Sequence, residues 1–299
     1  MVYNVFSIPV VYKYKAHFWS EATALHFFLL GLNIVLPIVF LHETRDMWKK
    51  FDVYRETPSI EFKYQYLVIF ESRNSNSFIC DSFDSKHYCQ EFQVHESDTD
   101  RDDRYDSLTI KISTVLPVNE PIYAVHVFLP VEFKVTTVCW FQMEGLIMTS
   151  YFSFHPGSSL QVFADLQLHQ KTPLPCTERD LTYNASLLNA NSKNELPKLF
   201  ADYNSRNAIT RLINEQTIWM KTTHNTNNTG FTTFTIDLHL RYPEQEIIYK
   251  TTFWQMIKWF LVQYLPVVGI LFVICKRVRK FVFTNNVIST VQMIHSSKY

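Results

Sequence analysis

Two long apolar runs, one near each end of the chain, flank a middle segment in which apolar and polar residues alternate. The first run covers residues 22–41, broken only by His26 and Asn33, and the second covers residues 253–275. In a helix that rises about 1.5 Å per residue, ~20 residues cross a hydrocarbon core of ~30 Å. The pattern therefore predicts two transmembrane helices with a large domain between them.

A buried helix or a cleaved signal peptide is the alternative for the first run. The run lacks the polar face of a soluble protein's helix, and no small-x-small cleavage pattern follows at residues 42–44. The second run is entered through Phe253-Trp254, whose rings suit the headgroup region. Lys258 lies near enough to that end for its ammonium to reach the interface. We interpret both runs as membrane spans.

The middle segment shows the period of two that is typical of strands. Residues 60–70 alternate and then become continuously apolar, while residues 108–112 and 234–242 alternate cleanly. Further strands are expected at residues 125–135, 146–154, 160–168 and 246–249, and a helix at residues 196–213. Short strands separated by polar turns predict a mainly β domain, antiparallel and sandwich-like, between the two helices.

Charge decides the predicted orientation. Lys+Arg and Asp+Glu are both 28, so no overall charge points to a nucleic-acid partner. Lys13 and Lys15 precede the first run, and a basic cluster that suits anionic lipids follows the second. The members of this cluster are Lys276, Arg277, Arg279 and Lys280.

The positive-inside rule then places both termini in the cytosol. The expected organisation is a cytosolic tail (1–21), a first span (22–41), an extracellular or lumenal β-rich domain (42–252), a second span (253–275) and a basic cytosolic tail (276–299). The glycosylation sequons at Asn184 and Asn227 both fall in the outer segment, which agrees with this orientation.

Four cysteines also lie in the outer segment, where an oxidising compartment would allow two disulfides in three connectivities. Cys80 and Cys89 are close enough in sequence to close a short hairpin-like loop. Cys139 stands beside Trp140 in an apolar stretch, so a bridged Cys139 and a buried, reduced Cys139 both remain open, and Cys176 is the fourth candidate for a bridge.

An acidic loop carries the most suggestive chemistry in the chain. Its carboxylates at loop positions 1, 3, 5 and 9 resemble the spacing of calcium loops: Asp98, Asp100, Asp102 and Asp106. Asp103 occupies the position where those loops need Gly, and Thr109 replaces their bidentate Glu. A structural calcium site and a solvated acidic turn, neutralised by Arg101 and Arg104, are therefore both retained.

Motifs of the common enzyme classes are absent from the sequence. It contains no H-E-x-x-H, G-x-S-x-G or Walker A pattern, and its histidines lack metal-ligand spacing to one another. We expect no catalytic residues, no cofactor apart from this calcium, and no small-molecule substrate. An interaction role is favoured over chemistry.

Particular segments resemble the transmembrane protein 231 family, from the first residues to near the last. They include residues 5–10, 156–160, 165–171, 173–176 and 183–186, and at the C-terminal end residues 241–243, 253–258, 262–264, 279–283 and 286–290. The acidic loop falls where that family carries a D-x-N-x-D-G-like run, but this chain lacks the Gly.

The resemblance implies a component of the ciliary transition zone that supports ciliogenesis and the diffusion barrier gating entry of membrane proteins into the cilium. It implies a multi-pass protein of the ciliary membrane in a complex with tectonic, B9-domain and Meckel-syndrome proteins. It carries over no catalytic residues. The alternatives are a cell-surface adhesion or receptor-like β-domain protein and a channel auxiliary subunit.

Overall fold

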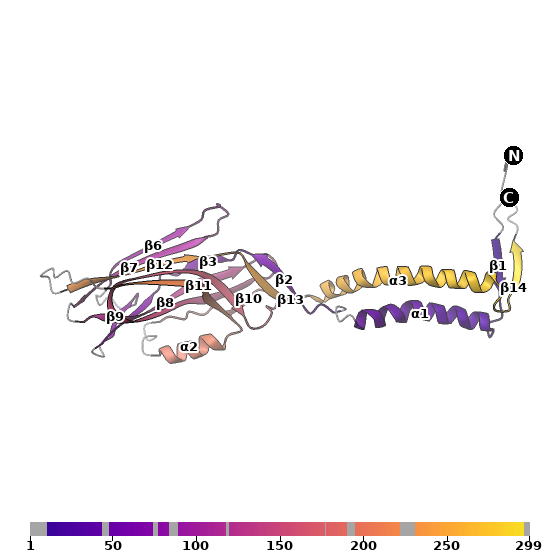
Figure 1. The fold of residues 1–299 in the computed structure, drawn as a ribbon, viewed down its shortest axis with the longest axis horizontal. Coiled ribbons are helices and arrows are strands. Elements are labelled where there is room, and N and C mark those ends of the chain that lie inside the picture. The colour runs from indigo at the N-terminus through magenta and orange to yellow at the C-terminus, as the bar shows by residue number, and fades with distance from the viewer. Residues whose placement is uncertain are drawn as a thin grey trace. The chain divides into compact units, whose positions relative to one another are not determined.

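The computed structural model describes residues 11–43, 48–73, 77–83, 89–117, 120–176, 178–189, 195–221 and 231–295. The chain divides into two compact units (Figure 1). The β unit consists of residues 51–251, and the helical unit consists of residues 1–50 and 252–299. The predicted class, a mainly β domain between two long apolar helices, is confirmed.

Two helices that pack against each other make up most of the helical unit. Both α1 (Glu21–Glu43) and α3 (Phe253–Thr284) are long and apolar enough to cross a membrane. Helix α3 continues from the predicted end of the span at Cys275 to Thr284. The prediction used hydropathy, which indicates only where the hydrocarbon core would end. The Lys and Arg residues that follow are good helix formers, so the helix continues beyond that point.

The segments predicted as tails contain a strand pair that the sequence analysis missed. Strands β1 (Val11–Lys15) and β14 (Val291–His295) pair antiparallel as a two-stranded sheet. The rings of Tyr14 and Phe283 stack with centroids 5.8 Å apart. Each strand is too short to stand out in the sequence, and its partner lies at the other end of the chain.

Ten strands of the β unit form one sheet, and β13 and β2 pair separately. The order along the large sheet is β5-β4-β8-β9-β12-β7-β6, with β3 on β8 and with β10 and β11 on β9. The bounds are β2 (Phe51–Glu56), β3 (Ser59–Phe62), β4 (Leu67–Ser72), β5 (Ser77–Asp81), β6 (Cys89–Ser97), β7 (Ser107–Pro117), β8 (Ile122–Val135), β9 (Phe141–Gln170), β10 (Asp180–Tyr183), β11 (Ala208–Lys221), β12 (Phe231–Arg241) and β13 (Gln245–Lys250).

Strand β9 joins two layers of this sheet. Its first half pairs with β8, and its second half pairs with β11 and, in parallel, with β12. Phe70 on β4 and Phe234 on β12 contact across the layers, with ring centroids 5.5 Å apart, although their strands are not hydrogen-bonded neighbours. The result is a sandwich, but not a purely antiparallel one, because β10 and β12 run parallel to β9.

Two strands predicted at residues 146–154 and 160–168 are therefore one continuous strand. Pro156-Gly157 resembles a turn in sequence, yet both residues lie within β9. A Cβ placed on Gly157 would approach the Trp219 ring to 2.3 Å, so glycine is needed here because an aromatic ring covers the backbone. No local signal distinguishes this role from a turn.

Two other predicted boundaries are wrong. The strand expected at residues 60–70 is interrupted between β3 and β4, where Tyr64 has a φ of 56°. The helix expected at residues 196–213 ends at Ser205 as α2 (Leu196–Ser205), and residues 208–213 belong to β11. Pairing with β9 satisfies the backbone of this segment, and that tertiary contact outweighs its local helical pattern.

Helix α2 packs with the outer side of one layer through a second apolar cluster that includes Phe128, Leu146 and Tyr203. The Tyr203 hydroxyl, which lies inside this cluster, accepts hydrogen bonds from the Leu146 and Thr210 N–H groups at 3.0 and 2.8 Å. Burial raises the pKa of Tyr203. This network ties α2 to the start of β11 and to β9.

Candidate functional site

The four cysteines of the β unit form two bridges in the structure. Cys80 pairs with Cys89, with Cα atoms 5.8 Å apart, and Cys139 pairs with Cys176, with Cα atoms 4.7 Å apart. The first bridge joins β5 and β6, which stand at opposite ends of the strand order in the large sheet. It therefore links the two layers at their edges.

The acidic loop gathers three of its four predicted ligands. Carboxylate oxygens of Asp98, Asp100 and Asp106 lie within 4.8 Å of one another, whereas Asp102 is not part of this group. Asp103 adopts a φ of 64°, the left-handed conformation for which calcium loops use glycine. The missing glycine therefore does not prevent the sharp turn.

Backbone N–H groups of the loop donate hydrogen bonds to two of these carboxylates. The Arg101 N–H donates to Asp98 at 2.6 Å, and the Thr99 N–H donates to Asp106 at 2.8 Å. Desolvation, together with the charges of Asp102 and Asp106, raises the pKa of Asp100. Three convergent carboxylates could hold a hard cation, but the same geometry also serves a turn closed by backbone hydrogen bonds.

Arg104 does not neutralise the acidic group as one interpretation of the sequence expected. Its guanidinium donates to the Thr57 carbonyl and lies 3.5 Å from the buried carboxylate of Glu56. Glu56 also accepts hydrogen bonds from the Thr136 and Thr137 N–H groups, both at 3.1 Å. Arg104 therefore anchors the loop to the β unit.

The remaining predicted residues lie apart from this loop. Asn184 follows β10 and is half-buried, while Asn227 lies outside the described residues. The basic cluster, Lys276, Arg277, Arg279 and Lys280, lies on the last turns of α3. Its attraction to anionic lipids and the use of the sequons stay predictions.

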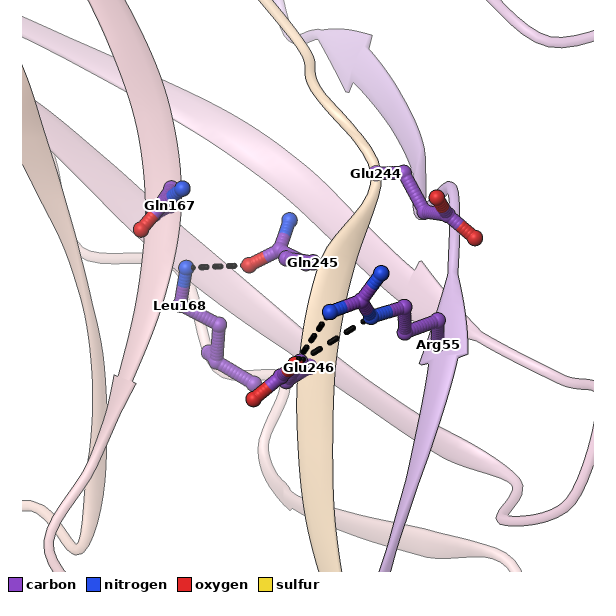
Figure 2. Close-up of a pocket in the computed structure, with 6 residues that line it drawn as sticks. All are labelled: Arg55, Gln167, Leu168, Glu244, Gln245 and Glu246. Atoms are coloured by element: carbon purple, nitrogen blue, oxygen red, sulfur yellow. Dashed lines mark hydrogen bonds and ion pairs between the residues drawn. The ribbon is translucent and has the colours of Figure 1, made fainter.

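A polar pocket of about 480 Å³ was missed by the sequence analysis (Figure 2). It lies where the small β2–β13 sheet meets β9, and its lining residues are Arg55, Gln167, Leu168, Glu244, Gln245 and Glu246. The signal in the sequence is the polar run Glu244-Gln-Glu246 after Pro243, which resembles an ordinary turn. Arg55, which completes the pocket, is distant in sequence.

Two glutamine side chains connect β13 to β9, next to the backbone hydrogen bonds that β13 forms with Leu174. The Gln245 side-chain oxygen accepts the Leu168 N–H at 2.6 Å. Gln170 accepts from the Ile248 N–H at 2.9 Å and donates to the Ile248 carbonyl at 3.0 Å. The pocket is therefore built on amide contacts between two sheets.

These features define a membrane protein with two candidate spans and a disulfide-bridged β sandwich between them in sequence. The family model described as Transmembrane protein 231 matches residues 1–292. The chain belongs to this family, and the resemblance seen in its sequence motifs is confirmed.

Relatives called "Transmembrane protein 231" match almost the whole chain. The Xenopus tropicalis protein is 28% identical over 302 residues, which cover 97% of this chain and 95% of the relative. The Homo sapiens protein is 28% identical over 303 residues, covering 97% and 94%. A structure titled "Cryo-EM structure of a proton-activated chloride channel" aligns with 88% of this chain and 97% of its own, at 7% identity and a TM-score of 0.32, too low to establish a shared fold.

Proposed function

We propose that this protein is a non-enzymatic membrane component of the ciliary transition zone. In this role it supports ciliogenesis and the diffusion barrier that gates the entry of membrane proteins into the cilium. The observation that carries the proposal is the family match over residues 1–292, joined to the transition-zone role that the resemblance implies. Its partners on this proposal are tectonic, B9-domain and Meckel-syndrome proteins, together with membrane lipids.

The proposed topology places both termini in the cytosol and the β unit outside it. The basic cluster at the end of α3 supports this orientation through the positive-inside rule. The two disulfides support it as well, since such bridges persist in oxidising compartments. Glycosidase treatment should increase the gel mobility of the full chain, and replacing Asn184 and Asn227 by Gln should abolish that change.

The proposed role needs the β unit as a binding domain, not as a catalyst. Its buried acids serve as structural partners: Glu144 pairs with Lys63 and accepts the Leu187 N–H at 2.7 Å, and Asp165 accepts from Arg241 at 2.8 Å. Such satisfied carboxylates stabilise a rigid surface, which suits a scaffold.

Localisation is the decisive experiment. A tagged full-length chain should concentrate at the base of the cilium, and its loss should alter the set of membrane proteins inside the cilium. An even distribution over the plasma membrane would contradict the proposal and favour an adhesion or receptor-like role. Unchanged ciliary membrane composition after loss of the chain would also contradict the barrier function.

A further inference from the structure

The basic cluster on the last turns of α3 has no acidic residue that neutralises it. No Asp or Glu follows Glu246 in the sequence, and Glu21 is the only acid before Glu43. Glu21 begins α1 and forms no ion pair with the cluster within the described part of the chain. The positive charges of the cluster can therefore pair with groups outside the chain.

Three members of the cluster lie on one face of α3. Lys276 and Arg279 precede Phe283 by seven and four residues, spacings that place all three on the same side of a helix. Lys280, three residues before Phe283, joins them. Arg277 is two residues from Arg279, so in a helix of 3.6 residues per turn it points about 160° away. The cluster therefore divides into a basic face of three residues and one arginine on the other side.

Strand β1 lies against this basic face. The ring of Tyr14 stacks on that of Phe283, with centroids 5.8 Å apart (Figure 1). Lys15, the residue after Tyr14, is exposed and ends β1, which pairing with β14 holds in place. The N-terminal segment thus brings a fourth positive charge close to the basic face.

The other side of the same helical segment is apolar. Val278 and Phe281 are 39% and 64% exposed, and both point away from Phe283. A helical segment with a basic face and an exposed apolar face suits the boundary between lipid headgroups and acyl chains. This segment begins directly after the apolar run that ends at Cys275, which places it at the depth of the headgroups.

We propose that the basic face of α3, together with Lys15, binds the headgroup of a lipid that carries several phosphate groups, such as an inositol phospholipid. The planar guanidinium of Arg279 donates two hydrogen bonds to one phosphate, and the lysine ammonium groups pair with the others. Such a headgroup concentrates several negative charges at one point, whereas a lipid with a single net charge neutralises one cation only. The inference specifies the membrane-lipid partner of the proposed function and does not depend on the ciliary role.

An acidic segment of a partner protein fits this surface less well than a lipid does. It would pair with the basic face, but it would leave Val278 and Phe281 exposed to water on the other side of the helix. A lipid bilayer covers the apolar side and supplies phosphate groups to the basic side at the same depth. One partner therefore accounts for both faces of the segment.

The test is native mass spectrometry of the full-length chain in detergent micelles, titrated with phosphatidylinositol bisphosphate or with phosphatidylserine. Phosphatidylinositol bisphosphate should bind saturably at concentrations at which phosphatidylserine does not. Arg279→Gln should weaken this binding by about fivefold, the effect of removing one cation from an anionic lipid. Lys15→Gln should weaken it as well, and an unchanged affinity would overturn the contribution of β1.

Arg277→Gln is the matched control, because it removes the same charge from the same turn but from the other side of the helix. It should bind like the wild type. Lys276→Gln, at an exposed position of the basic face, decides the question if Arg279→Gln does not fold.

Equal losses in Arg277→Gln and Arg279→Gln would indicate diffuse attraction and overturn the site. Equally tight binding of phosphatidylserine, or no saturable binding, would do the same. Soluble inositol trisphosphate binding as tightly as the lipid would overturn the lipid assignment. Localisation tests the ciliary role separately, so the two failures are distinguishable.

Discussion

Many large apolar side chains of the β unit are buried in its core, whereas most of those on α1 and α3 are exposed. In the β unit, Phe70 and Phe133 are fully buried, whereas in the helical unit Phe28 and Trp254 are 65% and 77% exposed. Apolar side chains on α1 and α3 face outward because a membrane, not the protein, would cover them. The buried phenylalanines therefore belong to the packed core of the β unit, while the exposed ones on α1 and α3 form a surface suited to lipid.

The largest expected difference comes from truncating one phenylalanine in each unit. Phe70→Ala removes a buried ring that contacts Phe234, and we expect it to lower the free energy of unfolding by about 3–5 kcal/mol. Phe28→Ala, facing lipid, should change it by less than about 1 kcal/mol. Urea unfolding of the full chain in nanodiscs, followed by intrinsic fluorescence, measures both. Equal losses would show that the comparison is wrong.

The two units also differ in their cysteines: both disulfide bridges lie in the β unit, and Cys275 of α3 is a free cysteine. The bridges span sequence separations of 37 and 9 residues. Loop-closure entropy predicts losses of about 4 kcal/mol for Cys139→Ser with Cys176→Ser and about 2.5 kcal/mol for Cys80→Ser with Cys89→Ser. Thermal unfolding tests this order, with Cys275→Ser as the control. Four free thiols in non-reducing mass mapping would refute it.

Replacing a glycine by alanine should destabilise the β unit but not the helical unit. Gly157→Ala sets a methyl group against the Trp219 ring and should cost about 1–3 kcal/mol, as overpacking does. Gly269→Ala, in α3, meets nothing within 4 Å and should be neutral or slightly stabilising. Denaturant midpoints of the two variants provide the measurement. A neutral Gly157→Ala would mean that Trp219 moves away without cost.

We expect the β unit to lose stability at alkaline pH, because a buried tyrosine must ionise there. Burial raises the pKa of Tyr242, with a further contribution from Glu96. Because the folded pKa lies above the unfolded value of about 10, stability is complete below pH 10 and falls as pH rises above it. Tyr242→Phe should be almost neutral at pH 7, since the hydroxyl has no hydrogen-bond partner among the described residues, and should reduce the alkaline loss. An unchanged pH profile of the variant would contradict this.

The smallest expected effect lies in the acidic loop. The pKa of Asp100 is raised, so its carboxylate is disfavoured in the folded state above that pKa, and the penalty disappears as pH falls below it. Asp100→Asn should therefore raise the melting temperature slightly at neutral pH. Because backbone N–H groups already bind Asp98 and Asp106, we expect added Ca²⁺ to leave the wild-type melting temperature unchanged. A rise with Ca²⁺ that Asp100→Asn abolishes would instead establish a cation site.

Local patterns predicted the elements that a local pattern can determine. The spans at residues 22–41 and 253–275 fall within α1 and α3, and the alternation at residues 108–112 and 234–242 falls on β7 and, up to Arg241, on β12. Of the candidate calcium ligands, three of four converge. The pocket could not be predicted, because Arg55 and Gln245 are brought together only by the pairing of β2 with β13.

The amino-acid sequence by itself determined the class of this protein: two long apolar helices, a strand-rich domain between them and membership of its family. The helices and strands are local properties, because hydropathy and period two are read within a few consecutive residues, whereas family membership rests on segments spread along the chain. Only the tertiary structure decided that β9 joins both layers, that Gly157 lies under Trp219, that the chain's first and last described strands pair, and that Arg55 and Gln245 line one pocket. Each depends on residues far apart in the chain, whose contact no local pattern records.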